Sequence, residues 1–131
     1  MPNHVHCILY LKQADFNLNK IISNGKRFMA YEMVKRLEQK EESMILQLLS
    51  ESVTEKEKKK GQLHKVFKDS FDAKAIFSDK FLHQKIDYIH YNPVRGKWQL
   101  VNNYTDYEHS SAAFYELNSY KHFAPLHYKD I

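Results

Sequence analysis

Glycine and proline are scarce in this chain, and their scarcity limits the folds open to it. Only three glycines and three prolines occur in 131 residues. Because these residues interrupt helices and strands, their scarcity favours long regular elements over a loop-rich or fibrous build. Hydrophobic residues make up 43% and aromatic residues 14%, which argues against a disordered chain. The length suits one modest core, so we predict a single domain over residues 1–131.

Charge and cysteine content bear on the partners and the cellular compartment of the protein. Twenty Lys and Arg against 16 Asp and Glu give a formal net charge of +4, which permits a polyanionic partner but does not require one. The single cysteine, Cys7, excludes an intramolecular disulfide and favours a reducing compartment. No signal peptide or bilayer-length apolar run is present. We therefore predict a cytoplasmic protein with no membrane partner.

Hydrophobic patterning predicts strands and helices in one chain. Residues 4–11 are rich in strand formers and are predicted as a buried strand. Apolar residues at three- and four-residue spacing predict helices over 16–39 and 44–60. The charged end of the second helix, before Gly61, indicates a solvated terminus, with contact to a DNA backbone as the alternative. Residues 66–71 suit a short strand or an extended connection.

A further helix is predicted from Ser78, a plausible N-cap, to about Tyr91. We expect Pro93 to end it, because the residue before a proline is disfavoured in helical geometry. The aromatic chain beyond residue 102 is expected to form short elements around the core.

Two histidines lie two positions apart on the predicted first strand. Side chains at this spacing point to the same face, so His4 and His6 could share one divalent ion. The motif is short and occurs by chance. The alternative is two unrelated polar residues near a frayed N-terminus.

The predicted helix over 78–91 also carries a polar stripe. Tyr88 and Asn92 lie one turn apart, roughly opposite the apolar Ile86. If the histidines and this stripe meet, His4, His6 and Asn92 supply three ligands to a metal that polarises a phosphodiester, and Tyr88 becomes a nucleophile. Mixed nitrogen and oxygen ligands suit Mg²⁺ or Mn²⁺, although imidazole would also accept Zn²⁺ or Ni²⁺. The alternative is a partly exposed tyrosine beside a C-capping asparagine.

Three sequence blocks, in order, resemble the single-tyrosine HUH transposases, especially the REP-associated tyrosine transposase branch. The blocks are MPNHVH at residues 1–6, DYIHYNPVRGKW at residues 87–98 and YEHSSA at residues 107–112. Each is weak alone, and together they are specific. They span most of the chain.

The resemblance implies a fold, a site and a substrate. The fold is α+β, an RRM-like (ferredoxin-like) antiparallel sheet with helices packed on one face. His4 and His6 match the metal-binding histidines, Tyr88 the nucleophile and Asn92 the third ligand. The substrate is single-stranded DNA, often near a hairpin, and the product is a 5′-phosphotyrosine. Relatives act as monomers or dimers.

Two departures from the family pattern stand out. The family has a strand, a helix and a second strand before the HUH block, whereas this sequence begins inside that region. We therefore expect an N-terminally truncated sheet, from an internal start codon or a decayed element, and homodimer formation through its exposed edge. Residues 39–61 exceed the compact family core and are predicted as a helical insertion.

Other residues carry weaker indications. Four basic side chains could contact DNA phosphates or be simply solvated: Lys26, Arg27, Arg95 and Lys97. His90 and Tyr91 could contact DNA or assist proton transfer, but packing or exposure is the first expectation. The leading hypothesis is a DNA strand transferase. The alternatives are a catalytically inactive remnant that binds single-stranded DNA and a structural protein whose histidines are incidental.

Overall fold

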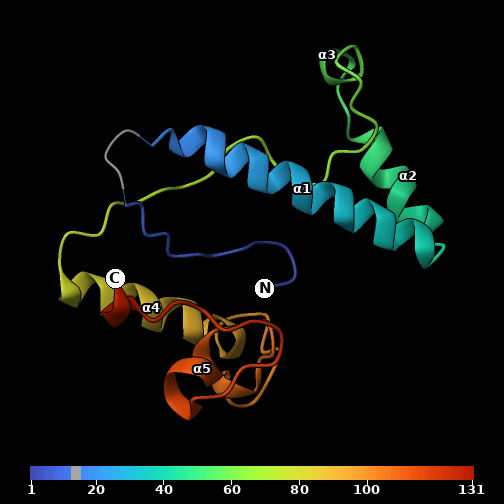
Figure 1. Ribbon diagram of the computed structural model, residues 1–131. Helices are drawn as coiled ribbons and strands as arrows, with labels where there is room; N and C mark the ends of the chain where they lie inside the picture. Colours follow the sequence, from blue (N-terminus) through green and yellow to red (C-terminus); the bar gives the residue numbers. More distant parts are fainter. Residues whose placement is uncertain (13–15) are drawn as a thin grey trace. The chain divides into compact units, whose positions relative to one another are not determined.

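The computed structural model describes residues 1–12 and 16–131, and the chain divides into two compact units. Unit 1 comprises Met1–Lys12 and Lys74–Ile131, and unit 2 comprises Gln13–Ala73. Unit 2 is thus inserted between the two stretches that form unit 1. Figure 1 follows the chain through both units.

The predicted antiparallel sheet is wrong. No strand occurs in the described ranges, 1–12 and 16–131. Residues 4–11 have strand-forming side chains, but a strand also needs a neighbour that takes up its backbone hydrogen bonds. Residues 66–71 are an extended connection and not a strand. Because these ranges contain no sheet, they offer no exposed sheet edge through which a homodimer could form. The homodimer itself stays a prediction.

Unit 2 is built on the long helix α1 (Leu18–Gln39), close to the predicted range of 16–39. The side chain of Asn17 caps its first turn by accepting a hydrogen bond from the Lys20 amide at 3.0 Å. Gly25 does not interrupt it, because tertiary contacts and good helix formers outweigh the propensity cost of one glycine.

The predicted helix over 44–60 is two helices, α2 (Ser43–Glu51) and α3 (Glu55–Lys58). Between them Val53 is buried at 4% exposure, and Thr54 starts α3 with a capping box that Glu57 completes. These helices occupy most of the predicted insertion at 39–61. Both helices lie within unit 2. The division of the chain into two compact units does not test the prediction of a single domain, which stays a prediction.

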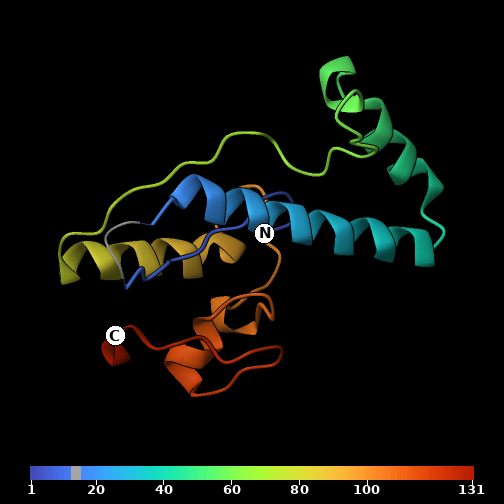
Figure 2. The same ribbon diagram turned by 45° about the horizontal axis from the view of Figure 1, so that its top comes forward.

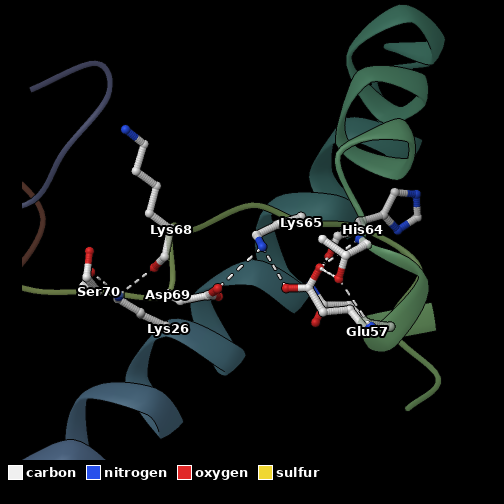
Figure 3. A network of polar contacts seen from close by, with 9 residues as sticks. Lys26, Glu57, His64, Lys65, Lys68, Asp69 and Ser70 are labelled. Carbon is white, nitrogen blue, oxygen red and sulfur yellow. Dashed lines mark hydrogen bonds and ion pairs between the residues drawn. The ribbon is translucent and has the colours of Figure 1, made fainter. Parts of the chain in front are cut away.

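A polar network holds the chain that follows α3 against the rest of unit 2 (Figure 3). Lys65 Nζ lies 2.6 Å from Glu57 Oε1 and 3.5 Å from Asp69 Oδ2. Lys26 Nζ, from α1, donates to the backbone oxygens of Lys68 at 2.7 Å and Ser70 at 2.9 Å. The extended segment after residue 64 is therefore held by side chains instead of a β-ladder.

Unit 1 is built on helix α4 (Asp79–Tyr91), which matches the predicted range of 78–91. Ser78 caps it as expected, by accepting from the Phe81 amide at 3.3 Å. The ordinary α-helix ends at Tyr91, but Asn92 keeps helical angles (φ −53°, ψ −43°) and the chain continues as the 3₁₀ turn η1 (Asn92–Val94). Pro93 is fully buried there, and this packing overrides the usual preference of a residue before proline.

Short elements complete unit 1, as predicted for the aromatic C-terminal part. They are η2 (Tyr104–Asp106), α5 (Ala112–Leu117) and η3 (Tyr128–Asp130). Figures 1 and 2 show the N-terminal segment running along α4 within this unit. None of the described helices is both long and apolar enough to cross a membrane.

Candidate functional site

Helix α4 has two faces, and Tyr88 is on the outer one. Ile86 and His90 point inward, with exposures of 9% and 4%. Tyr88, two residues from each, is turned away from them by the helical period and is 52% exposed. Its phenol is therefore accessible to a ligand.

The N-terminal segment brings both histidines to this tyrosine. The rings of His4 and His6 are 4.7 Å apart between centroids, and the His6 ring meets the Tyr88 ring edge-on at 5.5 Å. The two histidine rings are close even though no strand is present at residues 4–6. Three of the four residues of the predicted site thus lie side by side.

Local interactions leave a ring nitrogen of His4 open to a ligand and disfavour the charged form of His6. His4 Nδ1 lies 2.7 Å from Asn3 Oδ1. Since an amide oxygen only accepts, His4 donates from Nδ1 and keeps the Nε2 lone pair available. Partial burial, then the nearby His4 and the N-terminal amine, lower the pKa of His6. A neutral imidazole is the form that binds a metal.

Asn92, the predicted third ligand, occupies the C-cap of α4, one turn beyond Tyr88. Its Nδ2 is buried and lacks a hydrogen-bond partner among the described residues. Both the partly exposed tyrosine and the C-cap asparagine of the alternative interpretation are therefore observed. Within residues 1–12 and 16–131, no third Asp, Glu, Cys or His joins His4 and His6 in a metal-binding group. The amide oxygen of Asn92 is the third ligand that the sequence predicted.

Lys85 brings positive charge to the same face of α4. Its Nζ lies 5.9 Å from the ring centroid of Tyr88 and 4.9 Å from that of Phe81. A cation here can pair with a DNA phosphate. Lys85 was not among the residues predicted from the sequence, although its position three residues before Tyr88 places it on the same side of the helix.

His90 packs and does not reach the site, as first expected. Its Nε2 is 2.9 Å from Ser111 Oγ, and burial lowers the pKa of His90. Its neighbour Tyr91 lies against Tyr104, with ring centroids 4.4 Å apart. Both residues therefore anchor the C-terminal elements on α4.

The four basic residues predicted to contact DNA lie against aromatic rings or backbone oxygens of the protein itself. Arg95 stacks over Tyr91 at 4.7 Å, and Lys97 over Trp98 at 5.1 Å, both in unit 1. In unit 2, Lys26 is engaged with backbone oxygens and Arg27 lies 5.0 Å from the Phe28 ring. Only Arg95 and Lys97 belong to the unit that carries Tyr88.

A second group of ligating side chains was not foreseen. Glu108, His109 and His122 each offer a ligand atom, and these atoms lie within 4.8 Å of one another. A partial signal was present in the sequence, because Glu108 and His109 are adjacent, but His122 lies beyond α5 and only the fold brings it close.

Comparisons with protein families, with curated proteins and with solved structures find no match for this chain.

Proposed function

We propose that unit 1 carries a metal-dependent DNA strand-transfer site in which Tyr88 is the nucleophile, as in the single-tyrosine transposases that the sequence resembles. The edge-on contact of His6 with Tyr88 carries the proposal. It joins two segments, residues 1–6 and 87–98, that the resemblance linked only by analogy. The substrate proposed is single-stranded DNA, with hairpin-forming strands as the preferred targets.

The chain's own residues account for the steps as follows. Lys85, with Arg95 beyond the helix end, attracts the DNA backbone to α4. The Tyr88 Oη attacks phosphorus and the P–O3′ bond breaks, which leaves a 5′-phosphotyrosine. The leaving 3′ oxygen takes up a proton, and the phenol loses one, so the net proton balance is zero. Because the phosphotyrosine is an ester like the bond broken, a 3′ hydroxyl can reverse the step and reseal or transfer the strand.

The donor set fits a divalent metal. His4 and His6 would hold it through neutral imidazoles, with the amide oxygen of Asn92 as the third ligand. Such an ion supplies charge stabilisation at the phosphodiester when bound. Two imidazoles favour Mn²⁺ over the oxygen-preferring Mg²⁺, and both are to be tested.

The test follows the ends of a cleaved oligonucleotide. Hairpin-containing single strands, labelled at either end, are incubated with the protein and Mn²⁺ or Mg²⁺ and resolved under denaturing conditions. A 3′ label should migrate with the protein, and a 5′ label should be released. Tyr88→Phe should abolish the adduct. The matched control is Tyr31→Phe, because Tyr31 is a similarly exposed tyrosine (65%) on α1. An adduct that survives Tyr88→Phe contradicts the proposal.

A second candidate is single-stranded DNA binding without catalysis. The observation that favours it is the lack of a β-ladder behind His4 and His6 in the described part of the chain, since metal ligands are ordinarily held by a rigid support. This candidate predicts binding that weakens steeply with salt, no adduct under any metal, and equal affinity for Tyr88→Phe and the unaltered chain.

A further inference from the structure

Unit 1 contains a second group of ligating side chains, which flank helix α5 in the sequence: Glu108, His109 and His122. Glu108 and His109 stand in the turn after η2, and His122 follows α5. Asn118 makes their approach possible. It adopts left-handed angles (φ 48°, ψ 39°) at the end of α5, and the chain then turns back. The fold, and not sequence adjacency, places His122 at the turn.

The ligating atoms of this trio converge. His109 Nε2 lies 3.4 Å from Glu108 Oε1, and His122 Nε2 lies 3.9 Å from Glu108 Oε2. The two imidazoles are stacked, with centroids 5.2 Å apart and planes inclined by 11°. Parallel rings that both turn Nε2 toward one carboxylate leave a small space bounded by two nitrogens and an oxygen.

We propose that Glu108, His109 and His122 form a zinc(II) site, separate from the strand-transfer site. Two imidazoles and one carboxylate are a ligand set that Zn²⁺ accepts in four-coordinate sites with an open position. Zinc–ligand bonds of about 2.0–2.2 Å put neighbouring ligand atoms roughly 3.4 Å apart in a tetrahedron. The observed separations, all within 4.8 Å, close to that value by small side-chain rotations.

The surroundings of the trio allow a metal ion to bind, and they predict what binding would do to stability. All three residues are exposed, so their rotation is not opposed by packing. Glu108 and His122 also line a cavity of about 450 Å³, which leaves room for a water at the fourth position. A bound ion would clip the turn at residues 107–110 to the segment after α5. Zinc should therefore raise the melting temperature, since it binds only the folded chain.

Lys121 is the competitor at this site. Its Nζ donates to Glu108 Oε2, the oxygen that faces His122. The ammonium and the zinc ion would share one carboxylate, so each weakens binding of the other. Removal of the lysine should therefore tighten zinc binding, which is a prediction opposite in sign to that for the ligands.

The experiment isolates the trio from the other histidine pair. All variants are made in a His4→Ala/His6→Ala background, so that the outcome does not depend on the proposed strand-transfer site. Zinc is titrated by calorimetry, and cobalt(II) is titrated by visible absorption, in which a four-coordinate site gives intense bands. One zinc per chain is expected in this background.

The variants separate the ligands from their competitor. Glu108→Gln, a nearly isosteric change, should weaken zinc binding at least tenfold. His109→Ala/His122→Ala should abolish it, and Lys121→Met should tighten it several-fold. His64→Ala, in unit 2, is the matched control and should change nothing. Circular dichroism verifies the fold of each variant. Zinc binding that survives His109→Ala/His122→Ala, or that His64→Ala weakens equally, overturns the proposal, as does the absence of binding in the background chain.

Discussion

The ring of His6 stands edge-on to the ring of Tyr88, with centroids 5.5 Å apart and planes inclined by 77°. This pair joins the N-terminal segment to α4. A second pair, His83 and Tyr128, has nearly the same geometry elsewhere in unit 1, at 5.1 Å and 85°. One contact can thus be tested with the other as its internal standard.

Replacement of His6 by alanine should move the ring resonances of Tyr88 and leave those of Tyr128 unchanged. The physical reason is the ring current of an imidazole that lies within contact distance. His83→Ala should do the reverse. Proton NMR of specifically labelled tyrosines measures both effects. Unchanged Tyr88 signals in the His6 variant would show that the two rings do not meet in solution.

Two glycines of unit 2 should respond to alanine in opposite ways. Gly25 lies inside α1, and a β-carbon added there would meet no atom within 4 Å outside the helix's own backbone, so Gly25→Ala should stabilise by about 0.5–1 kcal/mol. Gly61 has open space too, but its φ is +83°. Gly61→Ala should therefore destabilise by about 1–2 kcal/mol through backbone strain alone. Urea unfolding followed by circular dichroism compares the two. Destabilisation by Gly25→Ala, or stabilisation by Gly61→Ala, would contradict the prediction for that residue.

Ser111→Ala should destabilise unit 1 by about 1–3 kcal/mol, because it leaves the Nε2 of buried His90 without its partner at 2.9 Å. Ser119→Ala is the matched control, since Ser119 is exposed in the same unit. It should cost almost nothing. Unfolding monitored at Trp98, also in unit 1, provides the measurement. A neutral Ser111 variant would mean that water replaces the hydroxyl.

The stability of unit 2 should fall as the solution is acidified below pH 4.5. Hydrogen bonds from Lys65 and then Thr54 lower the pKa of Glu57 from 4.5 to about 2. Since the folded pKa lies below the unfolded one, the contribution is complete above pH 4.5 and is lost as the pH falls toward 2. Glu57→Gln should flatten this dependence while its amide can still reach the capping position.

The control for that titration is Glu55→Gln. It removes a carboxylate from the same helix, one whose ion pair with Lys58 is more exposed (82% and 52%) than the pair of Glu57 with Lys65 (18% and 20%). Most of the slope between pH 4.5 and 2 should remain. A slope equally reduced in both variants would assign the effect to net charge and not to the Glu57 network.

The two long helices could be predicted from the sequence because their determinants are local. Apolar spacing and the Ser78 cap lie within the segments themselves, so the bounds of α1 and α4 were nearly correct. The break at Val53 was missed, although Thr54 and Glu57 have the spacing of a capping box. The strand over 4–11 was wrong because a strand is defined by a partner, which no local pattern supplies.

For the candidate site, too, the sequence predicted the local features and not the tertiary contacts. Spacing indicated that His4 and His6 share a side and that Tyr88 faces away from Ile86. It could not indicate that the two sets meet, and only the resemblance suggested it. The zinc-binding trio escaped prediction because His122 reaches Glu108 through the left-handed turn at Asn118, a tertiary arrangement with no periodic signature.

Because unit 2 lies between the two stretches of unit 1, the order of synthesis separates the parts of the site. A ribosome releases His4 and His6 first, then the whole of unit 2, and only afterwards Tyr88. At about 5–20 residues per second, the histidines wait on the order of ten seconds for the tyrosine. During that time unit 2 has all the residues that it needs to fold. A chain that stops within unit 2 contains the histidine pair but not Tyr88, so the proposed site could be completed only after α4 has been synthesised.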